Sequence, residues 1–398
     1  MMDYLERDSS ANAFGDFPSH PNVARRRSFM VATTTHDHCL QGHDHYARAN
    51  HQDNEAAVAC FRKALDLDPA CAAAYVGLSL AYSQRATALG LARTWLDEAV
   101  TAAEKAIAID SHLPAAYRAI WTACYPRQRQ RTMETAIRKM VDLDPDDVSA
   151  LRDLGWLLWF TGRAHEALPL LKRALALDPA FRWSHFWLGN AYLALALYKD
   201  AEAMYGKAVA LKPDLSSGHI GLICTYLSQR KSDHAIEQNQ RFRANPDDDR
   251  YFVKAADVEL LLGNTGEARA FAEKAAAAPD ARYMPRGVRA TTILGCILWA
   301  DDRTEAQRRL DQSAALDQRG LDEGDESSMP RYDLAAVHAI RGDTAEACRW
   351  LESAIEAGWR TYRLAMHDPL LRRLHPEPRF QRMMDALKVT VEAARQHL

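Results

Sequence analysis

Three prolines, Pro145, Pro179 and Pro213, follow one another at a fixed spacing of 34 residues, and this spacing constrains the fold more than any other feature. Each proline ends an apolar stretch that reads Leu-Asp-Pro or Leu-Lys-Pro. Because proline stops one helix and favours the start of the next, the spacing predicts units of two helices. A period of about 20 to 50 residues indicates stacked supersecondary units rather than one globular core.

Between these prolines, small and large residues recur in the same order in successive units. The matched positions are Leu154, Gly155, Leu158, Ala167, Leu171 and Ala174 in one unit and Leu188, Gly189, Tyr192, Ala201, Tyr205 and Ala208 in the next. These residues and their spacing resemble the tetratricopeptide repeat family. The resemblance implies an all-α, right-handed superhelical solenoid, in which small residues let paired helices approach and large residues fill the layer between hairpins.

The same register extends from about residue 41 to residue 358, which predicts about nine tetratricopeptide-like hairpins. The third is degenerate, because Met133 and Met140 stand where small residues are expected. We expect a disordered N-terminal arm over 1–35, a solenoid over 36–316, an acidic loop over 317–330, and a last hairpin with a C-terminal capping helix over 331–398. A cap is expected because the end of a solenoid would otherwise expose an apolar face to water.

The C-terminal tail also resembles the ends of tetratricopeptide regions attached to bacterial nucleotide cyclases and transcriptional regulators. Those proteins have an output domain in front of the repeats, whereas here we expect only the unstructured arm. The resemblance therefore favours a bacterial protein, and it does not carry over a signalling output.

Charge, hydropathy and cysteine content narrow the class of partner and the compartment. Fifty Lys and Arg against 53 Asp and Glu leave a formal charge of -3, which argues against a dedicated nucleic-acid-binding protein. The longest uncharged stretch, Trp183 to Tyr198, is shorter than the roughly 20 apolar residues of a membrane span. Seven dispersed cysteines without a CxxC pair predict reduced thiols in a cytoplasmic protein. Arg26 and Arg27 resemble part of an export signal but lack the apolar core that must follow.

No motif of a common catalytic scaffold, such as a GxxxxGK[ST] phosphate loop or an HExxH zinc helix, occurs in the chain. We therefore expect neither a cofactor nor an enzymatic activity. The alternative is a metal-dependent or enzymatic protein that uses the segment 36–51, which contains His36, His38, Cys39, His43, His45 and His51. If this segment is helical, Cys39 and His43 lie on one face at a spacing that suits zinc. A polar arm without metal is the other interpretation.

An aromatic stripe marks the surface with the strongest signal for binding. In tetratricopeptide proteins the first helix of each hairpin lines the concave face, which implies that its side chains outside the packing positions meet ligands. In the fourth and fifth hairpins this stripe carries Arg152, Trp156, Trp159, Phe160, Trp183, Phe186, Trp187 and Asn190. If half-exposed, its six rings would leave an apolar patch of roughly 600 Å². The alternative is that the rings close against one another.

These patterns predict a scaffold or adaptor that binds a hydrophobic or aromatic peptide or helix of a protein partner in the concave groove. Arg152 and Asn190 would orient backbone or acidic groups of that partner. A clamp for a C-terminal carboxylate is not expected, because Phe186 stands where a basic residue would be needed. A homo-oligomer, in which the stripe or the N-terminal arm fills the groove of a second copy, stays open.

Overall fold

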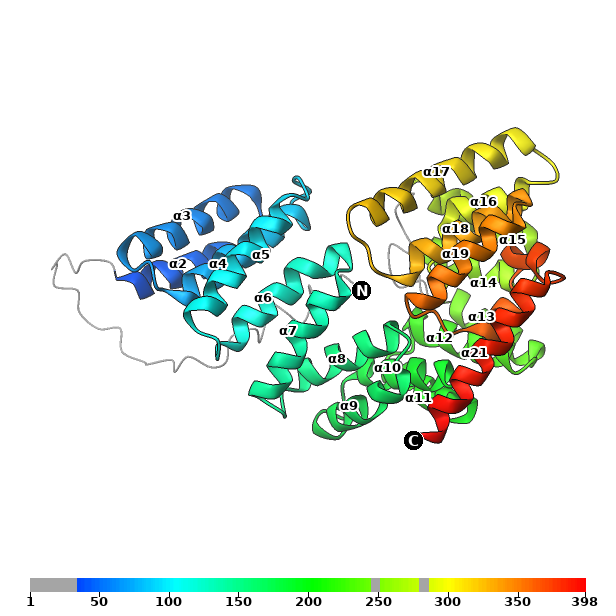
Figure 1. Cartoon of the computed structure of the whole chain (residues 1–398), viewed down its shortest axis with the longest axis horizontal. Coiled ribbons are helices and arrows are strands. Elements are labelled where there is room, and N and C mark those ends of the chain that lie inside the picture. The colour runs from blue at the N-terminus through cyan, green and yellow to red at the C-terminus, as the bar shows by residue number, and fades with distance from the viewer. Residues whose placement is uncertain (1–33, 245–250, 279–285) are drawn as a thin grey trace. The chain divides into compact units, whose positions relative to one another are not determined.

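Paired helices run through the described chain. A computed structural model of the protein describes residues 34–244, 251–278 and 286–398, and within these ranges the helices form nine consecutive hairpins followed by a terminal segment (Figure 1). The all-α repeat architecture expected from the 34-residue spacing is confirmed. The hairpins belong to two units: residues up to 145 apart from a short stretch, 127–130, form the first, and this stretch with residues 146–398 forms the second.

The first unit contains three hairpins in its described residues. Their helices are α2 (Thr35–Tyr46) with α3 (His51–Leu67), α4 (Ala72–Ala86) with α5 (Trp95–Ile109), and α6 (Pro114–Cys124) with α7 (Gln130–Leu143). A short 3-10 turn, η1 (Tyr125–Arg127), separates α6 from α7. Met133 and Met140 of α7 are buried, so the degenerate third hairpin fills its core with long, adaptable side chains.

The second unit contains the other six hairpins of the described chain. Their helices are α8 (Val148–Phe160) with α9 (Ala164–Leu177), α10 (Arg182–Ala194) with α11 (Tyr198–Leu211), α12 (Ser216–Ser228) with α13 (Ser232–Arg243), α14 (Tyr251–Leu261) with α15 (Thr265–Ala275), α16 (Ala290–Leu298) with α17 (Arg303–Asp322), and α18 (Ser328–Arg341) with α19 (Thr344–Glu356). The terminal segment consists of α20 (Tyr362–Ala365), the 3-10 helix η2 (Pro369–Leu374) and α21 (Pro378–Gln396).

Local signals in the sequence set where the helices begin and end. Thr34 caps α2 in a capping box with Asp37, and the Asp147 side chain caps α8 by accepting from two N–H groups of its first turn. Such a cap satisfies backbone donors that the helix leaves unpaired and stabilises it by about 1 kcal/mol. The three prolines at the 34-residue spacing all fall between hairpins, as predicted.

Glycine lets the two helices of a hairpin touch. Gly155 of α8 lies against Leu171 of α9, and Gly189 of α10 lies against the ring of Tyr205 on α11. A Cβ at either glycine would overlap the facing side chain, so the small residue is required for this approach. Leu171 and Tyr205 are completely buried, so these two recurring positions of the repeat belong to the hydrophobic core.

The terminal segment packs back onto the fourth to sixth hairpins. Gly358, at φ 104°, lies so close to the backbone of Thr161 that a Cβ on it would overlap this backbone. Leu364 joins the hydrophobic core of α12 to α14, and the Arg363 guanidinium lies 5.5 Å from the ring centre of Tyr198. Helix α21 contacts α19 and α20 (Figure 1). The segment therefore covers the turns of earlier hairpins as well as the end of the ninth.

Two expected boundaries differ from the structure. The acidic loop expected over 317–330 is reduced to residues 323–327, because α17 continues to Asp322 and α18 begins at Ser328. Asp317 holds this part of α17 in place, since its buried carboxylate accepts a 2.9 Å hydrogen bond from Arg289. At the other end, the arm expected over 1–35 lies outside the described residues except for Thr34 and Thr35, which cap and begin α2.

Candidate functional site

The first helices of the hairpins form an inner layer of the second unit. In the series α8, α10, α12, α14, α16 and α18, consecutive helices contact each other, and each also contacts the second helix of its own hairpin. These inner helices are buried almost all round: ten of the 13 residues of α8 are buried, against five of the 14 residues of α9. A helix buried on all sides lies inside the structure rather than on its surface. The predicted aromatic stripe belongs to this inner layer.

Six rings of α8 and α10 form one contiguous group, which we call the aromatic cluster: Trp156, Trp159, Phe160, Trp183, Phe186 and Trp187. Trp187 is its centre, because its ring centre lies 4.8–6.3 Å from those of Trp156, Trp159, Trp183 and Phe186. Trp156 also stacks on Phe160 at 5.2 Å. Each such pair contributes about 0.5–1.5 kcal/mol beyond the area it buries. The fold thus brings together all six rings that the sequence assigned to the stripe.

The exposure of these rings differs from the sequence expectation. Four of them, Trp156, Phe160, Phe186 and Trp187, are only 4–7% exposed, while Trp159 and Trp183 are partly buried. The expectation of half-exposed rings with a patch of roughly 600 Å² is therefore wrong. The period of one helix predicts which rings share a face, but it does not reveal that rings of the next helix cover that face.

The two polar residues of the stripe make contacts inside their own hairpins or with the adjacent turn. The Arg152 guanidinium lies 3.8 Å from the ring centre of Phe181, and one of its nitrogens lies 3.7 Å from the Asp178 carboxylate. The Asn190 side-chain oxygen accepts a 2.6 Å hydrogen bond from the Tyr205 hydroxyl. Both Arg152 and Asn190 are buried, so each links an inner helix to its neighbour.

A second group in the inner layer is built from charges. Arg286, in the segment before α16, pairs with Asp257 of α14 and with Asp368, the N-cap of η2. The Tyr332 hydroxyl of α18 donates a 2.5 Å hydrogen bond to Asp368. The side chains of all four residues are at most 3% exposed. We call them the ionic cluster, which joins three hairpins to the terminal segment.

Burial and pairing compete within the ionic cluster. Burial raises the pKa of Asp257, and the charge of Arg286 opposes that rise. Burial alone would lower the pKa of Arg286, but Asp257 and Asp368 raise it well above its ordinary value. Burial and the charge of Asp368 likewise raise the pKa of Tyr332 well above its ordinary value, so the phenol keeps its proton and donates it in a hydrogen bond. The stable arrangement is one guanidinium held between two carboxyl groups.

Hydroxyl groups and a further carboxyl group, Asp333, extend this region toward α17. The Ser313 hydroxyl of α17 lies 2.6 Å from the Thr292 hydroxyl of α16 and donates to Asp333 of α18 at 2.9 Å. All three side chains are completely buried. Three successive helices are therefore joined by directional contacts rather than by apolar packing alone.

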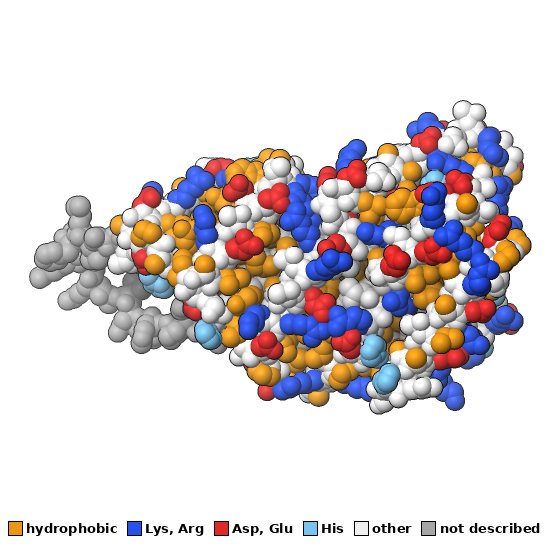
Figure 2. Space-filling model, in the orientation of Figure 1, with side chains coloured by type: hydrophobic (Ala, Val, Ile, Leu, Met, Phe, Trp, Pro, Cys, Tyr) orange, Lys and Arg blue, Asp and Glu red, His pale blue; other side chains and the backbone are white. Residues whose placement is uncertain are grey.

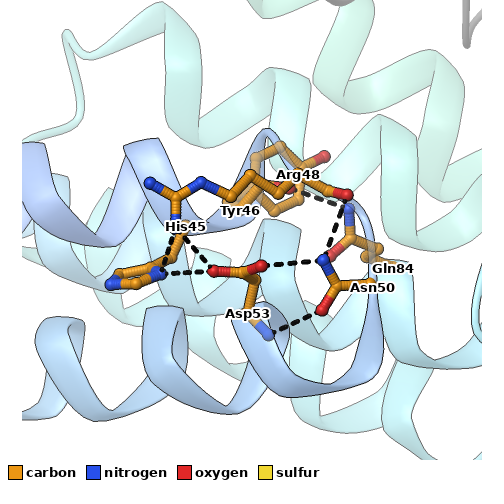
Figure 3. Close-up of polar contacts among 6 residues, drawn as sticks. All are labelled: His45, Tyr46, Arg48, Asn50, Asp53 and Gln84. Atoms are coloured by element: carbon orange, nitrogen blue, oxygen red, sulfur yellow. Dashed lines mark hydrogen bonds and ion pairs between the residues drawn. The ribbon is translucent and has the colours of Figure 1, made fainter.

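The His- and Cys-rich segment folds as α2 and the turn that follows it. His45 Nδ1 lies 2.7 Å from an Asp53 oxygen, and Arg48 donates to the same oxygen at 2.9 Å (Figure 3). Asn50 donates to the second Asp53 oxygen at 2.7 Å. Contacts with His45, Asn50 and Arg48 lower the pKa of Asp53 to about 2. These side chains serve the turn between α2 and α3.

Cys39 and His43 do share a face of α2, but that face packs inward. The ring centres of His43 and Phe61 lie 5.1 Å apart, and Cys39 Sγ lies 3.9 Å from Cys71 Sγ. Among the described residues, no group of three or more His, Cys, Asp or Glu is arranged to hold a metal ion. The metal-dependent alternative gains no support from the geometry of this segment.

Two general properties of the described surface bear on the kind of partner. Basic and acidic side chains are interspersed on the face drawn in Figure 2. Separately, none of the described helices combines the length and the apolar composition that a membrane crossing requires.

Sequence models of the tetratricopeptide repeat family match several stretches of the chain. One model matches residues 46–107 and 134–180, a second matches 158–220, and a third matches 328–353. The matched ranges include α8 and α10, which carry the aromatic cluster, and most of the last hairpin. The matched stretches of the chain are tetratricopeptide repeats. No curated protein matches its sequence.

The structure is also similar to solved structures of helical repeat proteins. A tetratricopeptide repeat protein from Parabacteroides merdae is 12% identical with a TM-score of 0.54, over 66% of this chain and 98% of that one. PilW, a widely conserved type IV pilus biogenesis factor, is 16% identical with a TM-score of 0.43, over 52% and 93% of the two chains. YrrB, a tetratricopeptide-repeat protein with an unusual peptide-binding site, is 17% identical with a TM-score of 0.40, over 48% and 94%. The likeness to the Parabacteroides merdae protein, at 12% identity, concerns the fold alone.

The residues of the aromatic cluster share a sequence pattern, whereas those of the ionic cluster do not. Arg286 is 29 residues from Asp257 and 82 residues from Asp368, so the three charges share no local pattern. Only Asp368 carries a signal in the sequence, because an Asp directly before Pro369 is typical of a helix N-cap. That signal predicts the start of η2 and says nothing about Arg286.

Proposed function

We propose that this protein is a scaffold that binds an apolar or aromatic segment of a partner protein at the aromatic cluster. The observation that carries the proposal is the contact of six rings across two neighbouring inner helices, α8 and α10. Tetratricopeptide repeats support a protein-interaction role for the fold as a whole. The aromatic cluster supports one location for that role.

Trp159 and Trp183 are the rings assigned to first contact with the partner. Both are partly buried, and both rest on the buried ring of Trp187, at 5.8 and 6.0 Å between ring centres. A rigid ring contributes much contact area at little cost in rotamer freedom, which makes Trp an effective interface anchor. Because Trp187 already restrains both rings, less ordering is required when the partner binds.

The chemistry of the cluster favours an apolar segment over a charged one. Ring faces and edges attract aliphatic and aromatic groups, whereas a peptide carboxylate needs accessible cations. Arg152 is stacked on Phe181 and faces Asp178, so contacts within the protein already partly balance its positive charge. Arg152 and Asn190, which the sequence suggested for orienting polar groups of the partner, are buried in contacts with Phe181 and Tyr205, so we assign them to fixing the two ends of the stripe.

A capture experiment with the double variant Trp159→Ala, Trp183→Ala tests the proposal. Proteins recovered from the native extract with the wild-type chain are quantified by mass spectrometry and compared with those recovered by the variant. We expect at least one partner of the wild-type chain to fall about tenfold or more, because two anchor rings each contribute on the order of 1–2 kcal/mol.

The matched control is the double variant Trp299→Ala, Trp350→Ala, which removes two partly buried tryptophans that pack on another core. Circular dichroism establishes that both variants keep their helix content. Equal recovery of every partner by the wild-type chain and by Trp159→Ala, Trp183→Ala contradicts the proposal. Loss in both double variants assigns the effect to stability rather than to the site.

We extend the proposal to a reducing compartment, such as the cytoplasm. All seven cysteines, each within the described residues, are free thiols. A scaffold that acts in an oxidising compartment would be expected to use some of them in disulfides. Light scattering of the purified chain addresses the remaining alternative, in which the aromatic cluster binds a second copy.

A further inference from the structure

Two cysteines of the first unit lie in contact although 31 residues separate them in the chain. Cys39 is on α2, and Cys71 is the N-cap of α4. Their sulfur atoms are 3.9 Å apart. Two thiols at van der Waals separation need only a small rotation about their side-chain bonds to reach the S–S bond length of about 2.05 Å.

The surroundings of the pair distinguish the two sulfurs. Cys39 is 6% exposed and packs with Ala64 and Ala74, whereas Cys71 is partly exposed at the start of its helix. Burial, and next the neighbouring Cys71, raise the pKa of Cys39 to about 12. Cys71 is therefore the sulfur that a reagent reaches first, and Cys39 is the sulfur that lies behind it.

We propose that Cys39 and Cys71 form a redox-reactive dithiol, which closes to a disulfide when a small-molecule disulfide reaches Cys71. The pair lies outside the aromatic cluster, so this modification site is independent of the proposed partner binding. It also differs from the metal site considered for this segment, because it uses two sulfurs and no histidine.

The chemistry follows thiol–disulfide exchange, with oxidised glutathione as the oxidant. The Cys71 thiolate attacks one sulfur of oxidised glutathione, the bond between the two glutathione sulfurs breaks, and one glutathione thiolate leaves. Cys39 then gives up its proton to solvent and attacks Cys71 Sγ, and the second glutathione thiolate leaves. Two protein thiols are oxidised by two electrons, and one glutathione disulfide is reduced to two thiols.

Closing this bond would fix the first hairpin to the second. Helix α2 packs on α3 and α4, and no hairpin precedes it among the described residues. The first hairpin of a repeat array is held by neighbours on one side only, and such ends open most easily. A covalent link from α2 to the start of α4 restrains that opening.

Peptide mapping of the full chain tests the proposal directly. The chain is incubated with oxidised glutathione, free thiols are blocked, and the unreduced protein is digested with trypsin. Cys39 and Cys71 fall in the separate peptides 28–48 and 64–85, and Cys60 falls in 49–62, so each link has its own mass. We expect a 28–48 to 64–85 disulfide peptide that disappears on reduction, and a loss of two of the seven free thiols.

Cys71→Ser and Cys60→Ser serve as test and control. Cys71 is partly exposed, so its replacement by serine leaves the core intact; the variant should lose the link, while Cys60→Ser should keep it. In the wild-type chain the link should raise the thermal midpoint by about 5 °C or more, and Cys71→Ser should show no rise.

Three outcomes overturn the proposal. One is a stable mixed disulfide of glutathione on Cys71 without a link to Cys39. The second is a link that joins Cys60 to either partner. The third is retention of all seven thiols under conditions that oxidise a reference dithiol peptide.

Discussion

On α8 and α10 the inner layer carries six aromatic rings in mutual contact, whereas around α14, α16 and α18 it carries a guanidinium between two carboxyl groups. The aromatic cluster lies wholly on first helices of hairpins, whereas the ionic cluster adds Arg286 from the segment before α16 and Asp368 from the terminal segment; both groups lie in the same unit and are largely buried. The two groups therefore differ both in side-chain chemistry and in the segments that supply them.

The two regions differ in how easily their internal contacts can be replaced by contacts with a partner protein. Ring packing is the sum of many weak contacts that depend little on direction, so one surface can be replaced by another of similar shape. A buried ion pair depends on both members, because removal of one leaves an uncompensated charge in a medium of low dielectric. The aromatic cluster is thus suited to binding, and the ionic cluster is suited to holding the terminal segment in one position.

The largest effect is expected from Arg286→Met. The variant leaves Asp257 and Asp368 buried without their cation, which should lower the free energy of unfolding by about 3–5 kcal/mol. Urea denaturation of the full chain followed by circular dichroism measures the change. The matched control is Arg379→Met, whose partner Glu352 is about 40% exposed, and there the loss should stay below about 1 kcal/mol. Equal losses of unfolding free energy in the two variants would show that the ionic cluster stabilises the protein no more than an exposed ion pair does.

A smaller effect is expected from Trp187→Phe at the centre of the aromatic cluster. Phenylalanine keeps a ring in contact with its neighbours and loses part of the buried area, so we expect a cost of about 1–2 kcal/mol. Arg286→Lys is the corresponding conservative change in the ionic cluster, and it should cost more because a lysine lacks the planar fork that spans two carboxyl groups. The same urea titration ranks the two. A larger loss of stability in Trp187→Phe than in Arg286→Lys would show that the aromatic cluster, and not the ionic cluster, tolerates substitution less.

The smallest effect concerns acid sensitivity near the aromatic cluster. His185 of α10 lies 3.2 Å from the Pro179 carbonyl through Nε2, and its buried Nδ1 has no hydrogen-bond partner among the described residues. Burial lowers its pKa below the ordinary 6.5, and the charge of Lys207 adds to that shift. The folded chain therefore binds this proton less well than the unfolded chain, and stability present above pH 6.5 is lost as the pH falls through the folded pKa.

His185→Gln should reduce this loss, because glutamine can still donate to the Pro179 carbonyl and does not titrate. Thermal midpoints of the two chains are compared between about pH 7.5 and about pH 5.5. The wild-type midpoint should fall further than that of the variant over this range. Parallel curves would show that the acid sensitivity arises elsewhere.

Much of the fold could be predicted from the sequence because the repeat is local. The positions of Pro145, Pro179 and Pro213 set the hairpin boundaries, and Gly155 and Gly189 set the close contacts within hairpins. The length of α17 could not be predicted in this way. Its extension through Asp317 depends on Arg289, the N-cap residue of α16 in the same hairpin, which lies 28 residues earlier, and no local pattern connects the two.

In the candidate site, too, the sequence predicts what a local pattern determines and does not predict contacts between distant residues. The period of α8 and α10 predicts which rings share a face, and the structure brings those rings together. Their burial depends on how neighbouring helices pack, which a single helix does not reveal. The contacts of Arg286 with Asp257 and Asp368, and of Cys39 with Cys71, join residues from different hairpins and have no counterpart in the repeat register.

The contact of Gly358 with the backbone of Thr161 has a consequence for how this protein can change in length. A repeat array with free ends can gain or lose a hairpin with little effect on the remainder, since each hairpin meets only its neighbours. Here the terminal segment must meet the turn after α8, so the number of hairpins between α8 and α20 is fixed by closure. Duplication or deletion of one hairpin in this interval would separate Gly358 from its contact, whereas the interval before α8 is free of that condition.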